Sequence, residues 1–350
     1  TRRYSMNNDK ISNLEFGFLS TFLYKAFILL NGFNIIINIT LNDSIISYII
    51  GLIISIFLIK TFISLFNKLP SLNIFEKVTY LFGKFSVVIK AILIISVSIF
   101  SSYLIYISSL FVRSSLLIDV DILPISILLF TTAIYLGGKG ITCITRTSII
   151  SFFIFVIFEV ITILFVIPNI NSLKILPLFA TSTSKIFISS IIYSVMSFAP
   201  IFLLLVIPKS MIKNSSTKSI KIFSLISNIY LVFNIILVLS VIDVHLAKII
   251  NYPELSVISK ISVLGFFDRM EDVLSFKFLL DVFITLALCS YYIKCGIKDT
   301  NKHQKYNIYI ISLTYLIILF ISNYIEFNYI YIIISMAIFI ITNVLILLKK

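Results

Sequence analysis

The 350-residue chain contains no tryptophan and few charged residues. Only 12% of its residues are charged, against roughly a quarter in soluble globular proteins, whereas 59% are hydrophobic. Its mean hydropathy is +1.12. So few charged residues cannot cover the surface of a soluble protein of this length. The composition therefore predicts an integral membrane protein. Without tryptophan, anchoring at the membrane interface falls mainly to tyrosine, lysine and arginine.

Cysteine and histidine are also scarce. The three cysteines, Cys143, Cys289 and Cys295, lack the spacing of metal ligands, and only two histidines accompany them. We therefore expect no metal, disulfide or cofactor. The sequence also lacks a nucleophile elbow, a phosphate-binding loop and a His-Glu metal signature, so we do not expect an enzyme.

Positive charge exceeds negative charge, with a formal net charge of +13. Nucleic-acid binding would require basic residues gathered on a soluble domain, and no segment is long enough to form one, so no nucleic-acid partner is expected. The excess is better interpreted as membrane topology.

A membrane-spanning helix needs about 20 mainly apolar residues, and hydropathy predicts ten of them in a single membrane domain over residues 1–350. The ten predicted spans are residues 15–37, 44–66, 86–111, 122–138, 147–167, 184–207, 219–242, 269–293, 306–322 and 328–348.

The connections between these spans alternate in charge. One set contains eighteen lysines and arginines and the other contains six. Because cytoplasmic connections retain basic residues, this separation predicts that both termini are cytoplasmic. Removing one span would move every later connection to the opposite side of the membrane and would spoil this separation of charge. Nine or eleven spans therefore fit less well. Two connections, residues 73–84 and 252–267, are predicted to contain short helices.

Two spans carry residues that disturb a helix in mid-membrane. The first contains Asn31, Gly32 and Phe33, and the sixth contains the run Ser197, Phe198, Ala199 and Pro200. Breaks at matching places in two halves are typical of inverted-repeat transporters, which bind solutes there. The expected repeats are residues 15–168 and 184–322, with 328–348 in the second half. Simple packing notches or kinks are the alternative.

The third predicted span presents a polar face. Ser98, Ser102, Tyr106 and Ser109 follow each other at spacings of three or four residues, and Tyr103 lies beside them. Serine at such positions usually serves helix packing. Tyr103 and Tyr106 are therefore the better candidates for lining a pocket.

Ionisable residues inside spans are costly and suggest function. Lys277 and Asp281 are four residues apart on one helix and can neutralise each other. Glu159 has no partner nearby in the sequence. It is interpreted as protonated, as paired with Lys25 in a structural ion pair, or as part of a proton route, and the structural pair is favoured.

The segment 252–274 reads YPELSVISKISVLGFFDRMEDVL. It resembles the segment before the eighth helix in B subunits of GerA-type spore germinant receptors. The specific part is Phe266-Phe267-Asp268-Arg269-Met270-Glu271, and Leu69-Pro70 and Leu176-Pro177 fall in the family's order. Leu264 and Gly265 depart from the family pattern, where a small residue and an acid are usual.

This resemblance implies a fold like that of amino acid, polyamine and organocation transporters, in the spore inner membrane. It implies a germinant receptor A subunit and a lipoprotein C subunit as partners, and a small nutrient, often an amino acid, as the ligand. Asn31, Gly32 and Phe33 match the broken first helix, and Ser197 to Pro200 match the broken sixth. Asp268, Arg269 and Glu271 are expected to serve packing or signalling.

The ligand is thus expected between helices 1, 3, 6 and 8, with Phe33, Tyr106 and Phe198 contacting its side chain. The main alternative is a secondary transporter of amino acids or related solutes. A third possibility is a scaffold subunit whose pocket has collapsed. A cavity bounded by Gly32, Tyr106 and Phe198 would favour recognition over the scaffold.

Overall fold

The computed structural model describes residues 10–117, 120–213, 217–259, 270–300 and 328–349, with backbone alone at 259, 270–275 and 299–300. All elements named in this part of the chain are helices. The first six are α1 (Asn13–Phe27), α2 (Phe33–Thr40), α3 (Ser44–Asn67), α4 (Ile74–Phe82), α5 (Ser86–Ser115) and α6 (Ile122–Lys139). The others are α7 (Ile141–Val166), α8 (Thr183–Phe198), α9 (Lys218–Val241), α10 (Val244–Ile249), α11 (Pro253–Ser259), α12 (Met270–Thr300) and α14 (Tyr329–Leu348).

Two non-α segments extend long helices. A π-helix, η1 (Ile28–Gly32), joins α1 to α2, and a 3₁₀ helix, η6 (Ala199–Val206), continues α8. The first predicted span is therefore α1, η1 and α2 together, and the sixth is α8 with η6. Short 3₁₀ turns occupy Leu41–Asp43, Gly83–Phe85, Ile167–Asn169, Ser172–Ile175 and Lys209–Met211.

Eight helical stretches in the described residues are long and apolar enough to cross a membrane. One of them, Asn13–Asn67, has 55 residues. That is about twice the length of one crossing, and it is divided at Leu41, whose φ of 50° ends the first helix. The stretch therefore holds the first two predicted spans. The others match predicted spans three to eight and ten in order, and the predicted ninth span lies outside the described residues.

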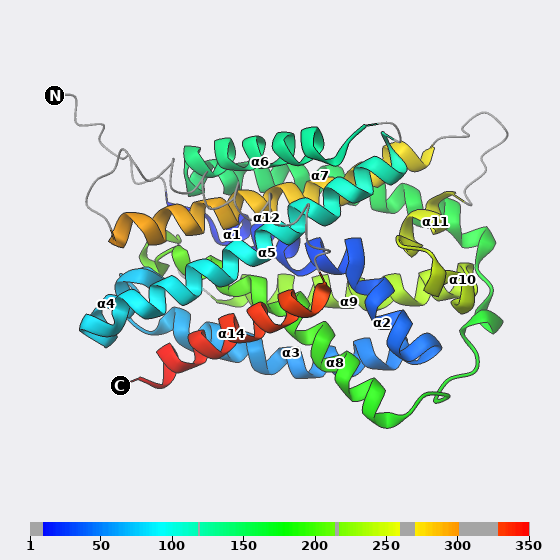
Figure 1. Cartoon of the computed structure of the whole chain (residues 1–350), viewed down its shortest axis with the longest axis horizontal. Helices are drawn as coiled ribbons and strands as arrows, with labels where there is room; N and C mark the ends of the chain where they lie inside the picture. The colour runs from blue at the N-terminus through cyan, green and yellow to red at the C-terminus, as the bar shows by residue number, and fades with distance from the viewer. Residues whose placement is uncertain (1–9, 118–119, 214–216, 260–269, 301–327, 350) are drawn as a thin grey trace.

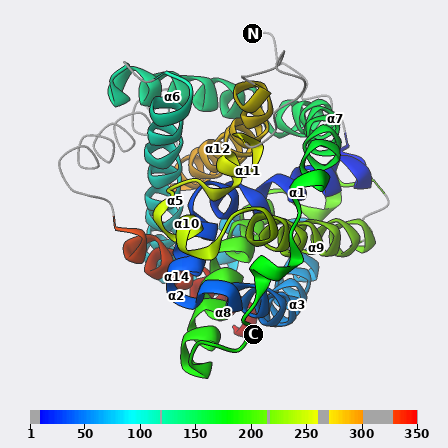
Figure 2. The same ribbon diagram turned by 90° about the vertical axis from the view of Figure 1, so that its right-hand side faces the viewer.

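The long helices lie side by side and form an elongated bundle (Figure 1). The short helix α4 and the end of α14 lie at one end of this bundle, whereas α10 and α11 lie at the other. Viewed from that other end, α10 and α11 lie in front of the middle of the bundle, between α5 and α9 (Figure 2). We call this end the α11 end.

Local sequence explains several helix starts. Ser12 accepts a hydrogen bond from the Glu15 backbone N–H while the Glu15 carboxylate accepts one from the Ser12 N–H, so a capping box begins α1. Asn73 and Glu76 do the same for α4. The prediction of a helix within residues 73–84 is therefore confirmed. In the second predicted connection, 252–267, α11 is a helix, and residues beyond 259 lie outside the described part.

Glycine lets two pairs of helices approach closely. A Cβ on Gly51 of α3 would lie 2.4 Å from the Tyr193 ring and 2.9 Å from the Ser190 carbonyl oxygen of α8. A Cβ on Gly137 of α6 would lie 2.0 Å from Ser290 Oγ of α12. These glycines therefore act as packing notches between neighbouring helices.

A buried carboxylate ties two connections together at the α11 end. Asp43, which has no exposed surface, accepts hydrogen bonds from the backbone N–H groups of Phe179 and Thr181 and from the Thr181 hydroxyl. The two bonds from Thr181 are both 2.7 Å long. Asp43 thus fixes the turn between α2 and α3 against the connection that leads into α8.

Candidate functional site

The first predicted break is a π-helical turn. In η1 the backbone N–H of Phe33 donates to the Ile28 carbonyl, five residues back, and the helix then continues into α2. The backbone departs from α-helical geometry where predicted but remains helical. Single π turns inside α-helices occur frequently at functional sites.

The side chain of Asn31 leaves η1 toward α5. Its Nδ2 donates to the Tyr103 hydroxyl at 2.5 Å, joining two of the predicted site residues. Tyr103 is buried, whereas Asn31 and Tyr106 are half-buried. The Tyr103 and Tyr106 rings lie 6.4 Å apart.

Two more phenols lie near this pair. Tyr252, just before α11, and Tyr329, at the start of α14, lie close enough to Tyr103 to interact with it electrostatically. We define the tyrosine cluster as Tyr103, Tyr106, Tyr252 and Tyr329. Together with Asn31 it offers hydroxyl and amide groups beside the π turn.

Gly32 and Phe33 do not face the tyrosine cluster. Phe33 stacks on Tyr48 of α3, with ring centroids 5.5 Å apart and planes at 6°. A Cβ on Gly32 would meet the Ile28 side chain, on the preceding turn, with Cδ1 nearest at 2.8 Å. Both residues are buried. They therefore contribute to helix packing in this structure.

The second predicted break is also irregular, because α8 ends at Phe198 and a 3₁₀ helix begins at Ala199. Ala199 and Pro200 are buried. The Ser197 hydroxyl reaches across to the Tyr24 carbonyl at 3.3 Å and to Asn228 Oδ1 at 3.4 Å. These contacts join the sixth span to the first and seventh.

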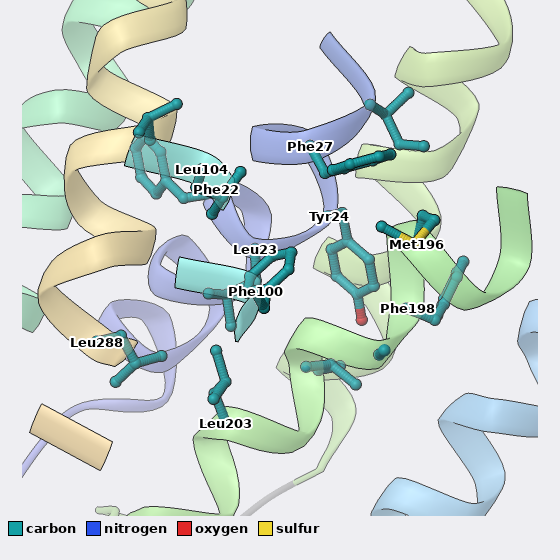
Figure 3. Close-up of a cluster of buried hydrophobic side chains, with 14 of the residues drawn as sticks. Phe22, Leu23, Tyr24, Phe27, Phe100, Leu104, Met196, Phe198, Leu203 and Leu288 are labelled. Carbon is teal, nitrogen blue, oxygen red and sulfur yellow. The ribbon is translucent and has the colours of Figure 1, made fainter. Parts of the chain in front are cut away.

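Phe198 lies in an aromatic core rather than beside Asn31. Its ring meets the Tyr24 ring edge-on at a centroid distance of 4.9 Å. Figure 3 shows both rings within a cluster that also includes Phe27, Phe100, Met196 and Leu203. The structure thus brings Asn31, Tyr103 and Tyr106 together and places Phe198 in a neighbouring aromatic cluster. Phe27 of this cluster lies 5.8 Å from the Tyr103 ring, centroid to centroid.

The serine hydroxyls on the polar face of the third span form hydrogen bonds within their own helix, α5. Ser98 donates to the Ile94 carbonyl, Ser102 to the Ser98 carbonyl, and Ser109 to the Ile105 carbonyl. These three hydroxyls are therefore satisfied locally, as the packing interpretation predicted.

Five hollows lie among the described residues, and none of them is the cavity expected between Gly32, Tyr106 and Phe198, because their linings include none of these three residues. The most spacious, about 760 Å³, is an apolar groove between α6 and α12. Another is a small cavity beside Glu159 and Lys277. This second hollow leads to the charged residues of the membrane interior.

Four buried charged residues of the predicted spans form two ion pairs, and the partners differ from the predicted ones. Lys25 Nζ lies 3.0 Å from an Asp281 carboxylate oxygen, and Lys277 Nζ lies 2.7 Å from Glu159 Oε2. The predicted pairings, Glu159 with Lys25 and Lys277 with Asp281, were therefore wrong. Packing of α12 against both α1 and α7 brings closer partners than the next turn of the same helix.

Both pairs are deeply buried, with side chains 1–8% exposed. Lys25 Nζ also lies 3.1 Å from the centroid of the Phe155 ring, a favourable cation–π contact. The pairs join helices α1, α7 and α12. Removing one partner would leave an uncompensated charge inside the membrane.

A fifth ionisable residue of this group was not predicted. Glu254 of α11 is only 6% exposed and lies in the wall of the small cavity with Glu159 and Lys277. Burial raises the pKa of its carboxyl well above the ordinary value, and the Lys277 ammonium partly opposes this shift. The spacing Glu254, Val257, Ile258 places it on an apolar helical face, which is the signal that could have revealed it.

The predicted signalling residues Asp268 and Arg269 lie outside the described residues. Glu271 lies in the first turn of α12, where only the backbone is described. Their packing or signalling role stays a prediction.

A family model described as spore germination protein matches residues 18–330, which is most of the chain. The chain belongs to this spore germination protein family. Comparison with curated proteins gives no match. The predicted family resemblance is confirmed, and with it an all-α, multi-pass membrane protein of spore germination, a receptor or permease.

For this spore germination protein, the matched region contains every described feature of the site. It begins within α1, before Lys25, and ends in the first turn of α14, just after Tyr329. The π turn, the tyrosine cluster, the ion pairs and α11 therefore all belong to the family region.

Proposed function

We propose that this protein is the nutrient-recognition subunit of a spore germinant receptor. It binds a small solute, such as an amino acid, between the first, third, sixth and eighth spans, which contain α1, α5, α8 and α12. The observation that carries the proposal is the hydrogen bond between Asn31 and Tyr103 at the π turn. A half-buried amide beside a buried phenol, next to the half-buried Tyr106, gives polar groups that can orient a solute. Most contact area in small-molecule sites is apolar, with few orienting polar groups.

In this proposal the other predicted residues position the spans around the site. Gly32 and Phe33 shape the π turn, and Ser197, Phe198, Ala199 and Pro200 hold the sixth span against Tyr24. An amino acid at Asn31 would lie beside the π turn of the first span. A five-plus-five inverted repeat would explain why irregular turns fall in both the first and the sixth spans.

The proposal extends to partners and location. An A subunit and a lipoprotein C subunit would complete the receptor in the spore inner membrane, with both termini of this chain cytoplasmic. The charge alternation of the connections supports this orientation. Membrane-facing apolar side chains such as Leu128 and Phe276, at the groove between α6 and α12, contact lipid or a partner.

A thermal-shift screen of the purified protein against the twenty protein amino acids tests recognition. The amino acid that raises the melting temperature is then used for germination dose-response curves in spores carrying the intact receptor. We expect Asn31→Leu and Tyr103→Phe each to raise the half-saturating concentration about tenfold, the effect of losing one hydrogen bond in the site. Tyr135→Phe, on an exposed tyrosine of α6, is the matched control.

Unchanged dose-response curves for both variants, in spores with normal receptor levels, would place recognition elsewhere. A secondary transporter is the second candidate, favoured by the buried ion pairs, because ionisable groups inside membranes often mark ion pathways. Uptake of the same amino acid into liposomes by the purified chain would favour transport. Absence of any thermal shift would favour a scaffold subunit.

A further inference from the structure

Helix α11 inserts a carboxylate among the buried charges at the α11 end of the bundle. Glu254 is 6% exposed, and its Oε1 has no hydrogen-bond partner within the described part of the chain. Helix α11 packs against α7, α9 and α12. The unpartnered oxygen therefore belongs to a side chain enclosed by three membrane helices.

The polar groups around Glu254 come from every helix that surrounds it. Helix α7 contributes Glu159 and Thr162, α9 contributes Tyr230 and Asn234, and α12 contributes Lys277 and Asp281. Lys25 of α1 also acts on Glu254 electrostatically.

The charges of this group balance without Glu254. Lys25 is paired with Asp281 and Lys277 with Glu159, so two ammonium groups meet two carboxylates. Within the described part of the chain, ionised Glu254 would add one uncompensated negative charge in a region where burying a charge is costly. One positive charge would restore neutrality.

The cavity beside Glu254 limits what can supply that charge. Its volume is about 10 Å³, close to the minimum that holds one water molecule. The Lys277 ammonium lies in its wall and would repel a metal cation. A proton needs neither a coordination shell nor space.

We propose that Glu254 is a proton-binding site, and that proton uptake at this carboxylate holds α11 in the bundle. Burial raises the pKa of Glu254, as described above, which favours the protonated form in the folded protein. Loss of the proton leaves a buried negative charge beside Glu159, and that charge is relieved when α11 moves toward water. The site does not depend on solute recognition at Asn31.

The sign of the pH effect follows from the raised pKa. Between the pKa of an unfolded glutamate, about 4.3, and the higher pKa in the folded protein, the folded state binds more protons than the unfolded state. Stability from Glu254 is therefore present at low pH and is lost as pH rises through this window.

The test combines infrared difference spectroscopy with thermal unfolding of the purified full-length protein from about pH 4 to 9. A protonated carboxyl gives its own C=O stretching band. We expect wild type to show such absorption above the pH range of exposed carboxylates, and Glu254→Gln to lose part of it. The melting temperature should fall with pH in wild type, and less steeply in Glu254→Gln. Asp121→Asn, at an exposed acid before α6, is the matched control and should behave like wild type.

An unchanged band intensity in Glu254→Gln, or an equal pH slope in both proteins, would overturn the assignment. So would stabilisation of wild type, but not of Glu254→Gln, when sodium chloride replaces choline chloride at equal ionic strength, because a metal cation would then occupy the site. If Glu254→Gln does not fold, the wild-type titration still decides. A carboxyl band lost at the pH of ordinary exposed acids would refute the proposal.

Discussion

The pairing of the four buried charges makes a quantitative prediction. At 3.0 Å, the separation of Lys25 and Asp281, Coulomb attraction is about 5 kcal/mol for an effective dielectric constant of about 20. Loss of either partner also strands a buried charge, so we expect Lys25→Met or Asp281→Leu to lower the free energy of unfolding by about 3–5 kcal/mol. The double variant should lose far less than the sum, because an apolar pair replaces the ion pair.

A double-mutant cycle measures this coupling. Free energies of unfolding for wild type, both single variants and the double variant are obtained by denaturant titration in detergent. The matched comparison is the same-helix pair Lys277 and Asp281. Their Cβ atoms are about 6 Å apart at this spacing, but each charge is paired with another helix, so these two residues should couple more weakly. Stronger coupling for that pair than for Lys25 and Asp281 would refute the pairing seen in the structure.

Two further variants test the packing of the helices. Asp43→Ala should lower the free energy of unfolding by about 3 kcal/mol, because three donors lose a charged acceptor, whereas Asp121→Ala at an exposed helix start should cost much less in the same titration. Gly51→Ala should cost about 1–3 kcal/mol by overpacking α3 against α8, whereas Gly138→Ala, whose Cβ meets nothing within 4 Å, should be neutral or stabilising. Equal changes in the free energy of unfolding for Gly51→Ala and Gly138→Ala would show that Gly51 does not serve close packing.

Hydropathy predicted the spans well because membrane insertion depends on each segment's own composition. The irregular turns were also predictable, since Gly32 and Pro200 disturb a helix wherever it packs. Their form was not predictable. Whether Gly32 produces an unwound segment or a π turn depends on the neighbours of the first span, which the sequence does not place.

The same limit explains the wrong ion pairs. Lys277 and Asp281 lie on one helix, so spacing alone suggested that they neutralise each other. The structure instead places a residue of another helix closer to each of them. Asn31 and Tyr103 illustrate the opposite case. Both were selected for position or chemistry within their own spans, and tertiary packing brought them together.

The first span connects the two regions of this molecule. Lys25 lies in the buried ion pairs, and Asn31 lies six residues later beside the tyrosine cluster, about 9 Å along the same helix. The π turn begins between them at Ile28 and includes Asn31, and a change in its register rotates one end of the span relative to the other. A solute that binds Asn31 and alters this turn would change the alignment of Lys25 with Asp281, and through α12 the surroundings of Glu254. Linkage is reciprocal, so proton binding at Glu254 would then change the affinity for that solute by the same factor.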